Sequence, residues 1–145
     1  GDMKATITSY VGGVIFAVGW WLLADAAVWA RHTDDPQQVK FEFILPGFVS
    51  TMGLWLLNAL PWSALQGSGF DGNRSARAKC ALFTSLLMCF TAIFGAMWIL
   101  IDIYSSDGAK ANSSWPGVAI LLQNVCIFLA AVVLRMGNTN DAGFC

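Results

Sequence analysis

Residues 80–101 have the sequence CALFTSLLMCFTAIFGAMWILI, and no charged side chain interrupts them. A helix needs roughly 20 mostly apolar residues to cross a hydrocarbon core about 30 Å thick. This stretch is therefore long enough and apolar enough to cross a membrane once. Its apolar residues run continuously rather than in the alternation of a barrel strand, which favours a helix whose backbone groups are satisfied within the segment.

Three other stretches have the same character. They are residues 5–30, where Asp25 is the single charge, residues 43–70 and residues 111–134. Each stretch holds one span and none comfortably holds two. We predict spans at residues 6–29, 43–62, 81–104 and 115–135. Residues 1–145 would then form one domain, an all-α integral membrane protein built as a four-transmembrane-helix bundle.

The composition agrees with this class of protein. Apolar residues make up 57% of the chain and charged residues 12%, whereas soluble domains carry about 25% charged residues. We therefore expect membrane lipids around the bundle and no nucleic-acid partner. The connections between spans are too short to hold a soluble domain, so any function has to come from the bundle itself.

The basic residues in the short flanks predict the orientation. Five of them would lie on one side of the membrane and three on the other. The first group is Lys4, Arg74, Arg77, Lys79 and Arg135, and the second is Arg31, Lys40 and Lys110. This bias predicts that both termini are cytosolic. The glycosylation sequence at Asn112 would then be lumenal but close to the membrane, and we expect it to stay unmodified.

Two carboxylates follow tryptophans at the same spacing inside apolar runs. Asp25 lies four residues after Trp21, and Asp102 lies four residues after Trp98. The predicted spans put both near the lumenal surface, where we expect them to cap or pair with a neighbouring helix. Cations in the nearby connections are Arg31, Lys40 and Lys110. A proton or cation relay would need further ionisable groups in the membrane, and the spans contain none.

The most deeply placed polar side chains are predicted to be Gln123 and Asn124. The fourth span begins near Trp115, with Pro116 and Gly117 in its first turn, where a proline costs no hydrogen bond. The two amides follow after roughly 12 Å of helix. Such residues either hold helices together or line a path for a substrate or ion. Packing is the favoured interpretation, and it extends to Asn58 in the second span.

An enzyme is not expected. The chain has one histidine, His32, and contains no Cys-x-x-Cys, His-Glu-x-x-His or glycine-rich phosphate motif. We predict no catalytic, cofactor-binding or metal-binding residues and no cofactor. Trp29, Trp62 and Trp115 suit the interfacial belts of a membrane. Trp20 and Trp21 would lie deeper and pack against neighbouring helices, and glycines such as Gly19 would permit close helix contact.

A series of short motifs resembles the transmembrane protein 50 family, which includes the fungal vacuolar protein sorting 68 proteins. The motifs cover nearly the whole chain in order. They are Gly13-Val14-x-Phe16, Gly19-Trp20-Trp21, Asp25-Ala26-Ala27-Val28, Asn58-Ala59, Met97-Trp98-Ile99-Leu100, Pro116-Gly117-x-Ala119, Gln123-Asn124, Phe128 and Gly137. Members usually carry a further N-terminal segment, so the resemblance implies that residues precede Gly1.

The resemblance implies a non-enzymatic role in an endomembrane, such as the endosome, endoplasmic reticulum or Golgi. It also implies a partner, a second four-span protein of the vacuolar protein sorting 55 and leptin receptor overlapping transcript family. We expect a complex subunit that supports endosomal or secretory protein sorting. Structural or partner contacts are predicted at Gly19, Trp20, Trp21, Asp25, Asn58, Trp98, Pro116, Gly117, Gln123 and Asn124.

Two other functions remain open. The chain could be an accessory structural subunit of a larger, unrelated assembly, such as a respiratory or translocation complex in an organellar inner membrane. Transport of a small solute through the bundle is the least favoured, because few ionisable groups lie within the spans.

Overall fold

A computed structural model describes residues 2–36, 38–60, 72–104 and 114–140, and these residues form helices without a strand. The helices are α1 (Asp2–His32), α2 (Phe41–Ala59), α4 (Gly72–Ile99), the short π-helix η1 (Leu100–Tyr104) and α5 (Trp115–Asn140). Within the described residues they form four spans long and apolar enough to cross a membrane, one of which comprises most of α4 together with η1. The predicted four-helix membrane fold is confirmed. The cytosolic placement of the termini stays a prediction.

The helices do not begin and end where the predicted spans do, because hydropathy alone does not set the end of a helix. α1 extends beyond residues 6–29 at both ends, because a helix need not stop at the edge of the apolar run. α2 ends at Ala59, and Leu60 is already extended at φ −78° and ψ 121°. Leu60 precedes Pro61, and a residue before proline is pushed out of the helical region. Trp62 lies outside the described residues.

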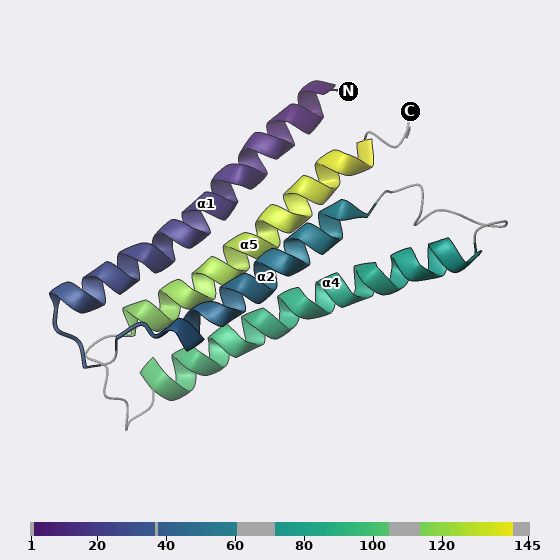
Figure 1. Ribbon diagram of the computed structural model, residues 1–145. Helices are drawn as coiled ribbons and strands as arrows, with labels where there is room; N and C mark the ends of the chain where they lie inside the picture. The colour runs from purple at the N-terminus through teal and green to yellow at the C-terminus, as the bar shows by residue number, and fades with distance from the viewer. Residues whose placement is uncertain (1, 37, 61–71, 105–113, 141–145) are drawn as a thin grey trace.

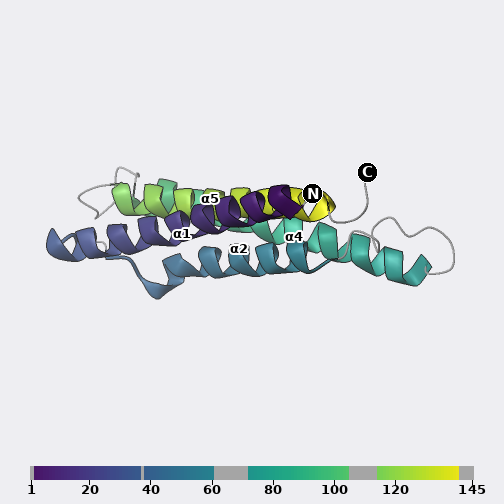
Figure 2. The same cartoon turned by 90° about the horizontal axis from the view of Figure 1, so that it is seen from above.

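α5 is the central helix of the bundle. It packs against α1, α2 and α4, and α2 also packs along α4. Figure 1 shows α1 and α4 running in one direction and α2 and α5 in the opposite one, and Figure 2 shows the same helices from above. α5 also has the largest buried share of the four spans. Residues on several faces of α5 therefore contact other helices.

The helices meet through small residues and turn large apolar ones outward. On α4 the buried positions Ser85, Cys89, Ala92 and Ala96 recur at intervals of four, three and four residues, which is the spacing of one helix face. Phe83 and Phe94 on the same helix are 68% and 66% exposed. Small residues let helix backbones approach closely in lipid, where outward apolar side chains carry no penalty.

Two apolar clusters fill the inside of the bundle. One lies near the start of α5 and consists of Leu23, Phe43, Ala96, Tyr104 and Ile120. The other lies further along α5 and consists of Leu54, Leu57, Ile127, Ala130 and Ala131. Gln123 and Asn124 lie between Ile120 and Ile127 in the chain, so the deepest amides sit between the two clusters.

Candidate functional site

The centre of the bundle holds the two amides that the sequence singled out. Gln123 and Asn124 are both fully buried on α5. Adjacent residues of a helix point about 100° apart, so the two side chains meet different neighbours. Both side chains point into the bundle, and their surroundings show what each amide does. Their depth in the membrane stays a prediction.

Both polar atoms of the Asn124 side chain form hydrogen bonds. The Ser50 hydroxyl of α2 donates to Asn124 Oδ1 at 2.6 Å, and Asn124 Nδ2 donates to the Ile120 carbonyl of its own helix at 2.8 Å. Ser50 is itself fully buried. A hydrogen bond of this kind between membrane helices contributes about 1 kcal/mol. Asn124 therefore joins α5 to α2.

Gln123 lies against the same helix but has no such bond. A Cβ on Gly47 would lie 2.6 Å from Gln123 Nε2, so the amide fills the space that a side chain at position 47 would need. Neither Nε2 nor Oε1 has a hydrogen-bond partner among the described residues. Pro46 lies beside Gly47 inside α2 and removes one backbone donor from that turn. The amide is packed without being satisfied.

Three small residues on α2 allow neighbouring helices to come close, and none of them was among the predicted contact residues. Gly47, Ser50 and Gly53 are buried and recur every three residues. A Cβ on Gly53 would lie 2.8 Å from Cys89 Sγ and 3.0 Å from the Ser85 carbonyl of α4. The three-residue spacing of small residues was the available signal. These residues bring α2 close to both α4 and α5.

Gly19 plays the corresponding part on α1. A Cβ there would lie 3.0 Å from Cys126 Cβ and 3.1 Å from the Gln123 carbonyl. The predicted close contact through Gly19 is therefore with α5. Cys126 is half-buried and Cys89 is buried, and both are free thiols.

The far end of α2 is held by Arg135 and Asn58. Arg135 Nη1 donates to the carbonyls of Leu57 at 3.1 Å and Leu60 at 2.6 Å. Asn58 Nδ2 donates to the Leu54 carbonyl at 3.0 Å and the Ala131 carbonyl of α5 at 3.4 Å. The last carbonyls of a helix lack partners within it, so Arg135 caps α2. From the sequence, Arg135 was assigned only to the basic residues that predict the orientation in the membrane.

The other end of α5 is anchored by its first turn. Pro116 and Gly117 are buried. A Cβ on Gly117 would lie 2.9 Å from side-chain atoms of both Leu100 and Tyr104. Pro116-Gly117 thus lets the start of α5 pack against η1.

The tryptophans behave less uniformly than predicted. Trp20 packs inside, with its ring 5.5 Å from Phe48 and 6.5 Å from Phe16. Trp21 is 74% exposed and Trp98 is 69% exposed. The expectation that Trp21 packs against a neighbouring helix of this chain is wrong, because the neighbour in sequence, Trp20, already takes the inward position.

The two Trp-x-x-x-Asp motifs both face outward. Asp25 and Asp102 are exposed, each one turn after its exposed tryptophan. Asp25 lies seven residues before the end of α1 at His32, and Asp102 lies within η1. Asp25 forms no ion pair with Arg31 or Lys40. Lys110 lies outside the described residues.

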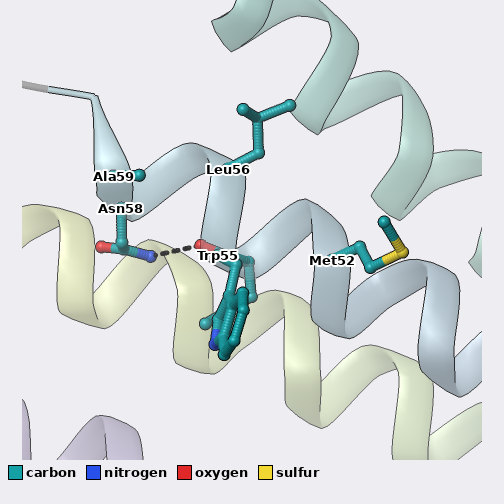
Figure 3. Close-up of a pocket in the computed structure, with 6 residues that line it drawn as sticks. Met52, Trp55, Leu56, Asn58 and Ala59 are labelled. Carbon is teal, nitrogen blue, oxygen red and sulfur yellow. Dashed lines mark hydrogen bonds between the residues drawn. The ribbon is translucent and has the colours of Figure 1, made fainter.

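A groove of about 450 Å³ lies along α2, away from the central amides. Its lining residues are Met52, Leu54, Trp55, Leu56, Asn58 and Ala59 (Figure 3). The lining is almost wholly apolar, and Trp55 is 76% exposed. The dashed bond in Figure 3 shows Asn58 turned toward its own helix. Neither Gln123 nor Asn124 lines this groove.

The described residues contain no group of three histidine, cysteine, aspartate or glutamate side chains that could hold a metal ion. Several of their buried or half-buried polar side chains, such as Ser50, Asn58 and Asn124, bond to a neighbouring helix or to their own. This arrangement can hold a bundle together.

Comparison with known proteins assigns the family. The model of an uncharacterised protein family, UPF0220, matches residues 1–142. A transmembrane protein 50 homolog of Dictyostelium discoideum is 31% identical over 91% of both chains. Vacuolar protein sorting-associated protein 68 of Saccharomyces cerevisiae is 28% identical over 91% of this chain and 81% of its own.

A UPF0220 protein of Schizosaccharomyces pombe is 27% identical over 91% of this chain and 81% of its own. No solved structure matches the chain. The relatives carry the names that the motif resemblance indicated, and the family model covers nearly every residue. The chain therefore belongs to the UPF0220 family, whose members include transmembrane protein 50 and vacuolar protein sorting 68 proteins.

Proposed function

We propose that this protein is a non-enzymatic membrane subunit that supports protein sorting in the endosomal or secretory pathway, within a complex of different membrane proteins. The observation that carries the proposal is the similarity over 91% of this chain to a protein named for vacuolar protein sorting. The four spans make the chain an integral membrane protein. The proposed location is an endomembrane, in keeping with the sorting role.

The centre of the bundle supports a structural role over solute transport. A transport path needs polar groups that face a continuous opening. Asn124 is instead occupied by Ser50 and Ile120, and Gln123 is pressed against Gly47. The deepest polar groups thus serve helix packing.

The proposed partner is a second small multi-span membrane protein, similar to the vacuolar protein sorting 55 and leptin receptor overlapping transcript family. The outward faces of this chain support such an assembly. They carry large aromatic side chains, among them Trp21, Trp55 and Trp98, and tryptophan is enriched where protein surfaces bind one another. Lipid covers the rest of the surface.

The test is purification of the full chain in a mild detergent from its own cells, with mass spectrometry of the proteins that stay bound, alongside a sorting assay. We expect a small multi-span protein in near-equal amount, and missorting of a vacuolar or lysosomal hydrolase to the medium when the chain is deleted. Recovery of respiratory or translocation subunits would favour the accessory-subunit alternative. Purification as a lone monomer, with sorting intact after deletion, would contradict the proposal.

A further inference from the structure

One row of residues on the outer side of α1 is not explained by packing within the chain. Gly13, Ala17, Trp21 and Asp25 follow one another at four-residue intervals, and all four are exposed. Residues four apart form a ridge along a helix. We call these four residues the outer row. The row ends in a carboxylate on a surface that otherwise faces lipid.

The register of α1 against α5 gives the depth of Asp25. The two helices are antiparallel, and the facing pairs are Thr8 with Gly137, Gly12 with Leu134 and Gly19 with Gln123. Leu23 shares a core cluster with Ile120. Continuing this register puts Asp25 opposite the first turn of α5, about one turn further into the bundle than Trp115. Asp25 therefore lies deeper in the bundle than Trp115, the tryptophan that is predicted to lie at the interface.

Asp25 is poorly placed to reach water or to be stabilised by its own chain. It has no hydrogen bond or ion pair with any of the described residues, whereas Asp102 does interact within the chain. The Cα–Cβ bond of a helical residue tilts toward the helix N-terminus, which for Asp25 is away from the nearer membrane surface. Charged groups within a span usually pair with groups of opposite sign, and none of the described residues pairs with Asp25.

The rest of the outer row suits close approach by another helix. A Cβ on Gly13 would meet nothing within 4 Å, so this glycine is not needed for packing within the bundle. Gly13 and Ala17 form a small-x-x-x-small pair, which lets a second transmembrane helix cross α1 at short distance. Trp21 then offers a large rigid contact between this pair and Asp25.

We propose that the outer row binds a transmembrane helix of a partner protein, and that this helix carries a lysine or arginine opposite Asp25. The inference rests on the proposed role as a subunit of a complex and names the surface and the chemistry of the contact. Charge decides against a second copy of this chain, because a symmetric contact along the outer row would bring two Asp25 carboxylates together. Charged groups within a membrane pair with groups of opposite sign.

The test is photo-cross-linking in native membranes with the full chain. Trp21 is replaced by p-benzoylphenylalanine, and the cross-linked peptide is identified by mass spectrometry. The expected peptide comes from a transmembrane segment of another protein with a lysine or arginine within about one turn of the cross-link. Asp25→Asn should reduce the yield about ten-fold or more, since neutralising one member of a desolvated charge pair weakens association at least that much.

Matched variants separate this contact from general damage. Gly13→Leu should also reduce the cross-link, whereas Asp102→Asn and the exposed α4 change Thr91→Leu should not. Unfolding temperatures in detergent should be unchanged for Asp25→Asn, because the carboxylate has no hydrogen bond or ion pair with the described residues. Exchanging the charges, with Asp25→Lys here and an aspartate at the partner's basic position, should restore the cross-link.

The other outcomes overturn the inference. They are cross-links to lipid alone, to a second copy, or to a helix without a basic residue, and a yield that Asp25→Asn leaves unchanged. A second probe at Phe94, on the outer side of α4, and co-purification without a probe distinguish this failure from failure of the proposed function. If a partner still co-purifies but the α1 probe captures no protein, the outer row is not the binding surface, and the proposed complex stands. If neither probe captures a protein and none co-purifies, both the outer-row contact and the proposed function are rejected.

Discussion

The centre of the bundle and the outer row of α1 both place polar groups in the membrane, but they satisfy them differently. Asn124 at the centre bonds to Ser50 of the neighbouring helix, and glycines on α1 and α2 fit closely around its neighbour Gln123. Asp25 has an open glycine and an exposed tryptophan on the same row and no partner within the described chain. In both regions small residues lie beside a polar one. At the centre this combination holds the helices together, and on the outer side of α1 it leaves a surface to which we propose a partner binds.

The largest predicted effect comes from filling a small position at the centre. Gly53→Leu should lower the free energy of unfolding by about 3 kcal/mol, because its side chain would meet the α4 backbone and α2 cannot move without losing its contact with α5. The measurement is thermal or denaturant unfolding in a mild detergent.

Gly13→Leu is the matched control, since the same substitution on the outer row meets open space. Its unfolding free energy should stay within about 0.5 kcal/mol of the native value. Equal losses for the two variants would remove the distinction between the two regions.

A smaller effect is expected at the hydrogen bond between α2 and α5. Asn124→Leu should cost about 1 kcal/mol, since it leaves the buried Ser50 hydroxyl without its acceptor. A double-mutant cycle with Ser50→Ala measures the bond itself, and the two losses should not add. Fully additive losses would mean that the two side chains do not stabilise each other.

The smallest effect is expected at Gln123, and its sign is informative. Gln123→Leu should leave stability unchanged or raise it by about 1 kcal/mol, because an apolar side chain removes a buried amide that has no hydrogen-bond partner. Protein sorting should persist in this variant. If sorting fails while the bundle unfolds normally, Gln123 lines a path, and the packing interpretation of the centre is wrong.

The sequence predicted the number of helices and drew attention to the two amides that the structure buries, because both inferences depend on local properties. The length of an apolar run decides whether it spans a membrane, and distance along the helix decides how deep Gln123 and Asn124 lie. The family resemblance likewise depended on motifs in the chain itself. None of these inferences needed to know which helix lies next to which.

The details that were missed depend on neighbours. Trp20 and Trp21 are equally apolar, and only the packing of α1 against α5, which also brings Trp20 next to Phe48 of α2, decides that Trp20 turns inward. Arg135 caps α2 because the carbonyl groups of Leu57 and Leu60, at the end of that helix, lie beside its guanidinium group. The regular spacing of Gly47, Ser50 and Gly53 was visible in the sequence, but only the packing of α2 against α4 and α5 gives it meaning.

The most direct test compares the two adjacent tryptophans. Trp20→Ala and Trp21→Ala are each measured for unfolding free energy in detergent and for the amount of partner that co-purifies. Trp20→Ala should lower the unfolding free energy by about 2 kcal/mol, because it removes the ring contacts with Phe16 and Phe48. Trp21→Ala should leave unfolding unchanged and remove most of the partner. Loss of stability from Trp21→Ala, or full retention of the partner, would contradict the assignment of one face of α1 to the bundle and the other to a partner.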